Sequence, residues 1–360
     1  MNRSHGWMAL FSLTGLFLLA AVAREQSPVK EQDDTKTRVT FDTFDGVKLV
    51  GTLFKGSKGS ESPVAILVHR FNSDRTKDGW QDLAKELQTK LNFAVLTFDL
   101  RGHGESTTVK DIFWTYQQNK GGLRNGYASK SKSSITTADF KSNYWPVLFN
   151  DLIAARKFMD DENDAQRCNS SAIVVIGAQE GAGLGIGWEV HEFERAVVVG
   201  GANALVTGVQ RRVAGEDILA GIWLGPVARG HGGIAFKPAD WFARPSASRL
   251  RDDAPQFFIY GKQDSNSATH IAGFLAAVKK PPEGNKGKTH SLDKELGLAT
   301  SLPGQELLRE AGLGVNGEII KFLSAKDGAL SKRGPVTWKA QNPGPMQFFP
   351  LSNFGYVPPG

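Results

Sequence analysis

The sequence predicts an α/β fold, in which a mostly parallel central sheet carries helices on both faces and begins with an antiparallel hairpin. Short continuous apolar runs, typical of strands buried on both faces, recur along the chain. Segments with the apolar spacing of amphipathic helices lie between these runs. Such alternation is the pattern of a parallel sheet covered on both faces, and two alternating segments around Asp45-Gly46 indicate the opening hairpin.

The predicted elements begin at residue 39 and follow one another along the chain. The hairpin pairs residues 39–44 with residues 47–54, because Asp-Gly suits a tight two-residue turn. Buried strands are predicted at residues 63–69, 93–100, 172–177, 195–200 and 256–261. Helices are predicted at residues 78–91 and 151–159, where apolar residues recur at helical spacing. A last strand could include residues 288–293.

The composition excludes several classes of protein. Of the 360 residues, 40 % are hydrophobic, which is enough for a sizeable core and excludes global disorder. Cys168 is the only cysteine, so a disulfide framework is excluded. The formal net charge of +6 is mild for this length and the basic residues form no long run, so we expect no nucleic-acid partner.

The N-terminal residues have the pattern of a targeting segment. Arg3 precedes an uncharged, mostly apolar stretch at residues 7–22, whose small-x-small end places cleavage near Ala23. This stretch is shorter than the ~20 residues that span a bilayer core. The sequence therefore predicts a signal peptide at residues 1–23, a polar linker at residues 24–38, and a secreted or periplasmic mature chain without an integral membrane segment. The alternative is an uncleaved N-terminal membrane anchor.

The rest of the chain is predicted to form one domain at residues 39–325, followed by a Pro/Gly-rich tail at residues 326–360. Two long segments, at about residues 107–145 and 202–255, interrupt the alternation and are predicted as insertions. The first carries six basic, two acidic and seven aromatic residues. It is either a functional cap or an ordinary surface insertion. The tail either drapes over the domain or stays mobile.

Four segments carry a family resemblance, at residues 45–53, 66–71, 98–106 and 176–183. The third contains Asp99-Leu100-Arg101-Gly102-His103-Gly104-Glu105-Ser106. Together they resemble the α/β-hydrolase superfamily, in particular its serine aminopeptidase and monoglyceride-lipase-like branch, whose Asp-x-Arg-Gly-His-Gly-x-Ser segment is matched at every fixed position. The resemblance covers roughly residues 40–325 and implies the α/β-hydrolase fold. It also implies that residues 101–106 are structural and that His103 is a loop histidine.

The fourth segment departs from the family at its most important position. The family's nucleophile elbow reads Gly-x-Ser-x-Gly, with the serine on a strained strand-to-helix turn. Here the glycines remain as Gly177 and Gly181, but the central residue is Gln179, followed by Glu180. A carboxamide cannot be activated as a nucleophile by a general base. We therefore expect an elbow that keeps its shape and has lost its chemistry.

The family's acid position has a clear match in this sequence, whereas its base position does not. The acid position is matched by Asp264 after a predicted strand, although an aspartate there could equally cap the following helix. In the context that precedes the family's final helix, Pro303 stands where the histidine would fall, and His290 is a weak candidate for the base. The oxyanion loop reads His69-Arg70-Phe71, and Arg70 is either solvated or positioned to hold an anion.

These patterns favour an exported α/β-hydrolase-fold protein that has lost serine-hydrolase activity and acts as a ligand-binding or structural module. The former active-site pocket could hold a small acyl, aromatic or anionic ligand. The alternative is an active hydrolase of esters or peptides that uses Glu180, Asp264 and His290 around an activated water. No cofactor or metal is expected, because the histidines lack ligand spacing and residues 181–187 fail the dinucleotide pattern. The oligomeric state is not predicted.

Overall fold

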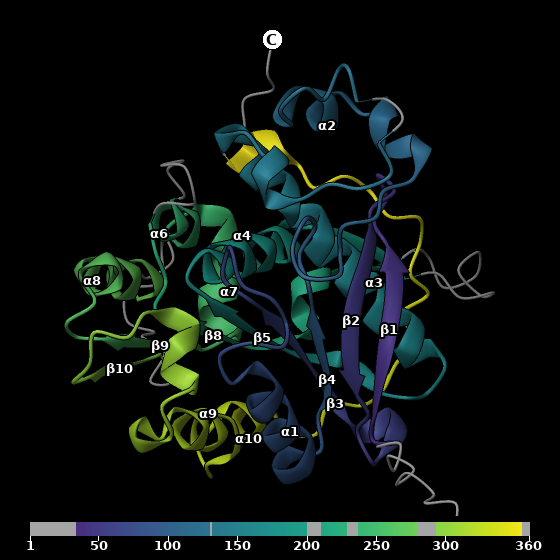
Figure 1. Ribbon diagram of the computed structural model, residues 1–360. Coiled ribbons are helices and arrows are strands. Elements are labelled where there is room, and N and C mark those ends of the chain that lie inside the picture. The colour runs from purple at the N-terminus through teal and green to yellow at the C-terminus, as the bar shows by residue number, and fades with distance from the viewer. Residues whose placement is uncertain (1–33, 130–131, 200–209, 229–236, 280–292, 355–360) are drawn as a thin grey trace, which may run out of the picture. The chain divides into compact units, whose positions relative to one another are not determined.

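A computed structural model describes residues 34–129, 132–199, 210–228, 237–279 and 293–354 of the chain. The predicted signal peptide therefore lies outside the described residues, together with most of the predicted linker. Within the described part, an eight-stranded sheet has the order β1-β2-β4-β3-β5-β8-β9-β10 (Figure 1). Its strands are β1 Lys36–Asp42, β2 Lys48–Phe54, β3 Pro63–Val68, β4 Ala94–Phe98, β5 Asn169–Ala178, β8 Ile218–Leu224, β9 Gln256–Gly261 and β10 Lys294–Leu298.

The pairing of the strands agrees with the predicted mixed sheet. β1 and β2 form the opening antiparallel hairpin, and β2 pairs antiparallel with β4. From β4 to β10 every pair is parallel. The carboxyl ends of these parallel strands share one edge of the sheet, where open α/β sheets place their ligands.

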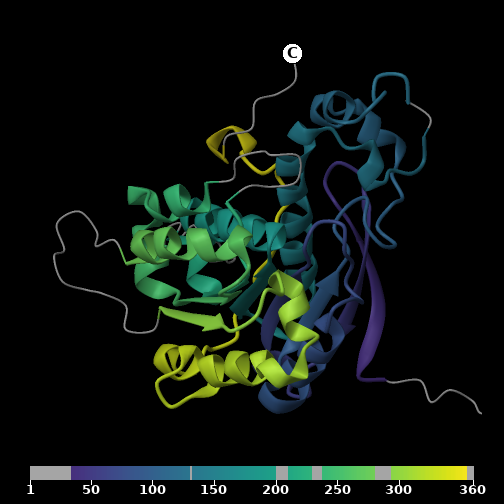
Figure 2. The same ribbon diagram turned by 60° about the vertical axis from the view of Figure 1, so that its left-hand side comes forward.

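Helices cover both faces of the sheet, as predicted (Figure 2). One face carries α1 Trp80–Leu91, α9 Val315–Ser324 and α10 Ala329–Arg333. The other carries α3 Phe149–Asp164, α4 Glu180–Glu194, α6 Pro238–Phe242, α7 Ser248–Asp253 and α8 Ser265–Val278. Strand β5 shows why the two cores are separate, because Ile173 and Val175 pack into one while Val174 and Ile176 pack into the other. Alternate side chains of a strand point to opposite faces, so a strand buried on both sides is apolar throughout.

One predicted strand has a different place. Residues 195–200 were expected as the fourth buried parallel strand, but β6 Ala196–Val199 pairs antiparallel with β7 Gln210–Val213 in a separate two-stranded sheet. The position next to β5 belongs to β8, which lies inside the segment predicted as the second insertion. Every residue of β8 is buried, whereas Ala196 is exposed. A short apolar run does not by itself distinguish a central strand from a half-exposed hairpin.

The first insertion, residues 107–145, folds over the hairpin end of the sheet and is called the cap below (Figure 1). It contains η2 Asp111–Thr115, α2 Gln117–Gly122, η3 Thr137–Asp139 and the start of η4 Ser142–Leu148. Bridges join Val47 to Val109 and Thr108 to Ser134. Its aromatic residues Phe113, Trp114 and Tyr144 are buried, so the cap has a core of its own that continues into the domain.

The C-terminal tail drapes over the domain through residue 354, which is one of the two predicted alternatives. Trp338 donates its indole N–H to the Asn163 carbonyl at 3.1 Å. Farther along, Phe349 stacks on Phe149 of α3 with ring centroids 4.1 Å apart. In the described residues, no helix has both the length and the apolar character required to cross a bilayer.

Candidate functional site

The predicted nucleophile elbow is present. Gln179 joins β5 to α4 with φ 48° and ψ −112°, a backbone conformation that non-glycine residues rarely adopt. The helix that follows passes so close to β3 that a Cβ atom at Gly181 would collide with the carbonyl oxygens of Val68 and His69. The two elbow glycines are therefore explained by close approach of backbones, as the motif predicts.

The side chain of Gln179 contacts the Pro303-Gly304 segment, where Pro303 stands at the position of the family's catalytic histidine. A Cβ atom at Gly304 would collide with the Gln179 Cγ atom, and Gly304 itself has φ 43°. The Gln179 Oε1 atom is buried and has no hydrogen-bond partner among the described residues. The structure thus brings the nucleophile position and the Pro303-Gly304 segment into contact, as a triad would require of their counterparts.

The backbone N–H groups of the oxyanion loop donate hydrogen bonds to side chains of the same protein. On this fold, the hole combines the N–H after the nucleophile with an N–H from the loop after the equivalent of β3. Here the Arg70 N–H donates to Gln305 Oε1 at 3.1 Å, and the Phe71 N–H donates to Glu180 Oε2 at 3.3 Å. Side chains of the protein therefore already accept from both N–H groups of this loop, which is the segment that supplies one donor of an oxyanion hole.

The guanidinium of Arg70 is partly exposed and lies near two carboxylates. It lies 3.3 Å from Glu306 and 3.6 Å from Asp78, and the Arg70 side chain is 28 % exposed. Two carboxylates already balance its charge. An anionic ligand at Arg70 would have to compete with these two carboxylates and would be repelled by them.

Asp264 has the geometry of a helix cap. It is the N-cap of α8, where its carboxylate accepts from the Asn266 N–H at 3.1 Å and from the Ser267 hydroxyl at 2.7 Å. Each bond uses a different carboxylate oxygen. The structure therefore supports the capping alternative for Asp264. His290, the weak candidate for the base, lies outside the described residues.

Two buried histidines lie near the oxyanion loop. His69 donates through Nδ1 to the Arg70 carbonyl at 2.6 Å, and its Nε2 accepts from the Leu100 N–H at 3.0 Å. His103 donates through Nδ1 to the Arg101 carbonyl at 2.9 Å. Burial lowers the pKa of His69 to about 4 and that of His103 to about 3. Both rings are therefore neutral and weakly basic at pH 7.

Arg101 has the structural role that the resemblance implies. It is fully buried, and its guanidinium donates to Asp45 in the opening hairpin at 2.7 and 2.9 Å and to Asp151 of α3 at 2.7 Å. It also donates to the Tyr144 hydroxyl in the cap at 3.1 Å. Burial raises the pKa of Asp151 to about 6, although Arg101 opposes this shift. One side chain thereby joins the hairpin, α3 and the cap.

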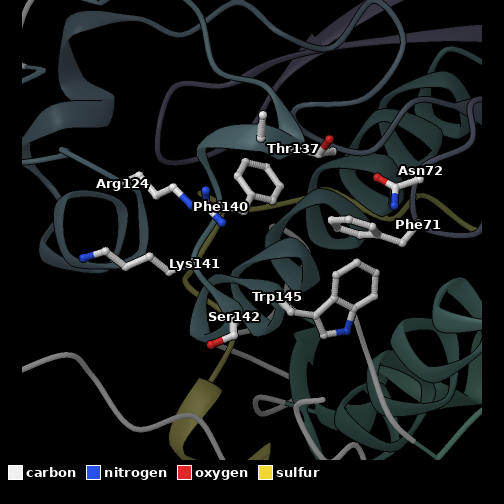
Figure 3. Close-up of a pocket in the computed structure, with 9 residues that line it drawn as sticks. Phe71, Asn72, Arg124, Thr137, Phe140, Lys141, Ser142 and Trp145 are labelled. Atoms are coloured by element: carbon white, nitrogen blue, oxygen red, sulfur yellow. The ribbon is translucent and has the colours of Figure 1, made fainter. Parts of the chain in front are cut away.

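An open pocket of about 380 Å³ lies between the oxyanion loop and the cap (Figure 3). It is called the cap pocket below. Its lining residues are Phe71, Asn72, Arg124, Thr137, Ala138, Phe140, Lys141, Ser142 and Trp145. The rings of Phe71 and Trp145 meet edge to face with centroids 4.9 Å apart, and the Phe140 ring centroid is 6.4 Å from that of Phe71. The pocket therefore combines an aromatic wall with two cationic side chains, and none of its described lining residues is a carboxylate.

Sequence reasoning missed two parts of this site. Gln305 follows Pro303-Gly304 and is fully buried, but nothing in its sequence context indicates that its amide reaches the oxyanion loop. The cap pocket was indicated only by the basic and aromatic composition of residues 107–145. Among the described residues, no group of three or more His, Cys, Asp and Glu side chains could hold a metal ion.

No protein-family model and no curated protein sequence matches the chain. Solved structures do match it. An esterase from Pyrococcus furiosus is 18 % identical, with 84 % of this chain and 92 % of that chain covered and a TM-score of 0.51. Dienelactone hydrolase from Anabaena variabilis is 14 % identical, with 80 % of this chain and 96 % of that chain covered and a TM-score of 0.47. A serine hydrolase homologue from Coxiella burnetii is 14 % identical, with 80 % and 97 % covered and a TM-score of 0.43.

Identities this low show the fold alone, so the likeness says nothing about which reaction the chain performs. It agrees with the strand order and with the strained turn between β5 and α4. The described chain therefore has the α/β-hydrolase fold and resembles that superfamily.

Proposed function

We propose that this protein is an exported α/β-hydrolase-fold protein without serine-hydrolase activity, and that it binds a small ligand in the cap pocket. The observation that carries the proposal is the state of the former catalytic centre. Gln179 occupies the nucleophile position on an intact elbow, and the two loop N–H groups beside it are bonded to Gln305 and Glu180. The frame of the site remains, while the described residues place no nucleophile at the elbow and the two loop N–H groups are already bonded.

Acyl transfer requires a nucleophile, a base that takes its proton, and donors for the oxyanion. Gln179 cannot be the nucleophile because its amide nitrogen is not basic and its oxygen is a weak acceptor. The two described histidines close to the loop make poor bases, since the Nε2 lone pair of His69 accepts from a backbone N–H and the pKa of His103 is lowered to about 3 by burial. Ligand binding is still supported, because Phe71 of the oxyanion loop lines the open cap pocket.

The activity test compares the wild-type protein with Gln179→Ser. We expect neither to react with a fluorophosphonate probe, and neither to hydrolyse short p-nitrophenyl esters above the buffer rate. In a triad the loss of one member already removes most of the rate enhancement, so a restored hydroxyl without a base stays inert. Ester turnover by the wild type that His290→Ala abolishes would overturn the proposal and favour the hydrolase built on Glu180, Asp264 and His290.

The export part of the proposal rests on the sequence of residues 1–23. We expect the mature protein to begin near Arg24, which N-terminal sequencing of the secreted or periplasmic material can establish. Recovery of the chain from Met1 in a membrane fraction would instead favour the uncleaved anchor.

A further inference from the structure

We infer that the cap pocket takes a small aromatic anion, a one- or two-ring compound that carries a carboxylate or a phosphate. This inference rests on the proposed function, because it names the chemical class of the ligand that the cap pocket would bind. Three properties of the pocket carry it: its aromatic wall, its uncompensated positive charge and its size.

The aromatic wall is formed by segments far apart in the sequence. Phe71 comes from the oxyanion loop, whereas Phe140 and Trp145 come from the cap. The Phe71 ring lies between the other two, with centroids 4.9 Å from Trp145 and 6.4 Å from Phe140. Figure 3 shows the three rings grouped at the pocket. Aromatic rings prefer edge-to-face or offset contacts with other rings, so this wall favours a flat aromatic ligand over a flexible chain.

Two cap lysines outside the pocket are paired with carboxylates. Lys110 forms an ion pair with Asp42 at 2.6 Å, and Lys132 forms one with Asp139 at 2.7 Å. Neither of these lysines lines the pocket.

Arg124 and Lys141 do line it, and among the described residues neither forms an ion pair. The Lys141 ammonium is held by the Gly121 carbonyl at 2.8 Å, which fixes a positive charge without neutralising it. Because the described lining residues include no carboxylate, an anion bound beside Arg124 gains from its charge without repulsion from these residues.

The size of the pocket limits the ligand. About 380 Å³ is near the lower end of the roughly 300–1,000 Å³ found for small-molecule sites. A long lipid or a peptide would extend well beyond it. A compound with one or two rings and one anionic group can contact the aromatic wall while its charge reaches the side of Arg124. Thr137 and Ser142 line the same pocket and add hydroxyl donors there.

The experiment measures the binding of 2-naphthoate, its neutral isostere 2-naphthamide and 2-naphthyl phosphate to the full mature protein by isothermal titration calorimetry. We expect 2-naphthoate or 2-naphthyl phosphate to bind at least tenfold more tightly than 2-naphthamide, because the amide lacks the charge. The comparison of the two acids distinguishes a carboxylate ligand from a phosphate ligand. Arg124→Gln should weaken binding of the preferred acid about tenfold while leaving that of the amide unchanged.

Lys132→Gln is the matched control, because it removes a cap cation that is already paired with Asp139 and lies outside the pocket lining. It should leave all three affinities unchanged. Equal binding of acid and amide, or an equal loss in Arg124→Gln and Lys132→Gln, would overturn the anionic class while leaving a binding function in place. No binding of any of the three compounds would overturn the aromatic class as well. Ester hydrolysis by the same preparation would instead contradict the proposed function.

Discussion

The catalytic centre and the cap pocket meet at Phe71 and are organised in opposite ways. The backbone N–H of Phe71 is bonded to Glu180, and the N–H of the preceding residue is bonded to Gln305. The ring of Phe71 instead faces an open pocket whose described lining residues include Arg124 and Lys141 and no carboxylate. The two loop N–H groups are therefore bonded within the chain, whereas the two cations of the pocket form no ion pair with the described residues.

On the proposed function, this difference means that the scaffold of a hydrolase site and a binding pocket beside it are maintained separately. The elbow keeps a strained backbone at Gln179 and close contact between α4 and β3, although a glutamine stands at the nucleophile position. Strain of this kind persists only where the surrounding structure imposes it. We therefore expect substitutions in the centre to change stability and substitutions in the pocket to change binding.

The largest effect is expected at the elbow glycine. Gly181→Val places a branched side chain where even a Cβ atom would collide with two backbone carbonyl oxygens of β3 and its loop. We expect a loss of about 3 kcal/mol or more in the free energy of unfolding, measured by chemical denaturation. The control is Gly273→Ala in α8, where a Cβ atom would meet nothing within 4 Å. It should stabilise the protein by about 0.5–1 kcal/mol. Equal behaviour of the two variants would show that the elbow is not packed as described.

The second effect concerns Glu189, which lies on the elbow helix and is fully buried. Burial raises its pKa to about 8, and a bond from the Gln256 amide at 3.2 Å only partly opposes this. The folded protein thus holds a proton that the unfolded chain releases near its ordinary pKa of 4.5. Its contribution to stability is full below that pH and is lost as the pH rises through about 8.

Glu189→Gln should remove this pH dependence. We expect the variant to be more stable than the wild type by a few kcal/mol at pH 8.5 and nearly equal to it at pH 5, because the amide is never charged. Urea denaturation across this range measures the difference. His69 and His103 lower the stability of both proteins as the pH falls below their ordinary pKa of 6.5, so their effect cancels in the difference between the variant and the wild type. A constant difference between the two proteins at all pH values would contradict the assignment.

The third effect tests whether the hydrogen bonds of Gln305 stabilise the oxyanion loop. Gln305→Met keeps the length of a buried side chain but removes its bonds to the Arg70 N–H at 3.1 Å and the Lys77 carbonyl at 3.0 Å. We expect a loss of about 1–2 kcal/mol, since the partly buried Arg70 N–H would lose this acceptor and the Lys77 carbonyl would keep only its bond from the Trp80 N–H. In the cap, Gln117→Met removes an exposed bond to the Tyr127 hydroxyl and should cost less than about 0.5 kcal/mol. Thermal or chemical denaturation that ranks the two variants the other way round would argue against a closed loop.

The sequence predicted the fold wherever local pattern and burial coincide. The runs that became β3, β4, β5 and β9 are continuous and buried, so their strand character follows from composition alone. β8 was missed because its apolar run lies within a long segment that was treated as an insertion. Its place next to β5 is set by long-range pairing rather than by its own residues.

Only the part of the site that lies within a local sequence motif could be predicted. The glycines on either side of Gln179 are fixed by close backbone contacts, which a motif records directly. The bond from Gln305 to the oxyanion loop joins residues 235 positions apart, and no local pattern carries such information. The neutral state of His103 and the paired state of Arg70 likewise depend on neighbours contributed by other loops.

The smallest effect on stability is expected in the cap pocket itself. Arg124 is exposed and has no ion pair among the described residues, so Arg124→Gln removes a charge without leaving a buried group unpaired. We expect the free energy of unfolding to change by less than about 0.5 kcal/mol, measured by denaturation without ligand. In the presence of saturating 2-naphthoate the wild type should gain stability by mass action, and the variant should gain less because it binds the anion more weakly. A variant that is destabilised without ligand would mean that Arg124 supports the cap rather than a ligand. Arg124 and Gln305 would then have the same kind of role, because each would stabilise the folded protein through contacts within the chain.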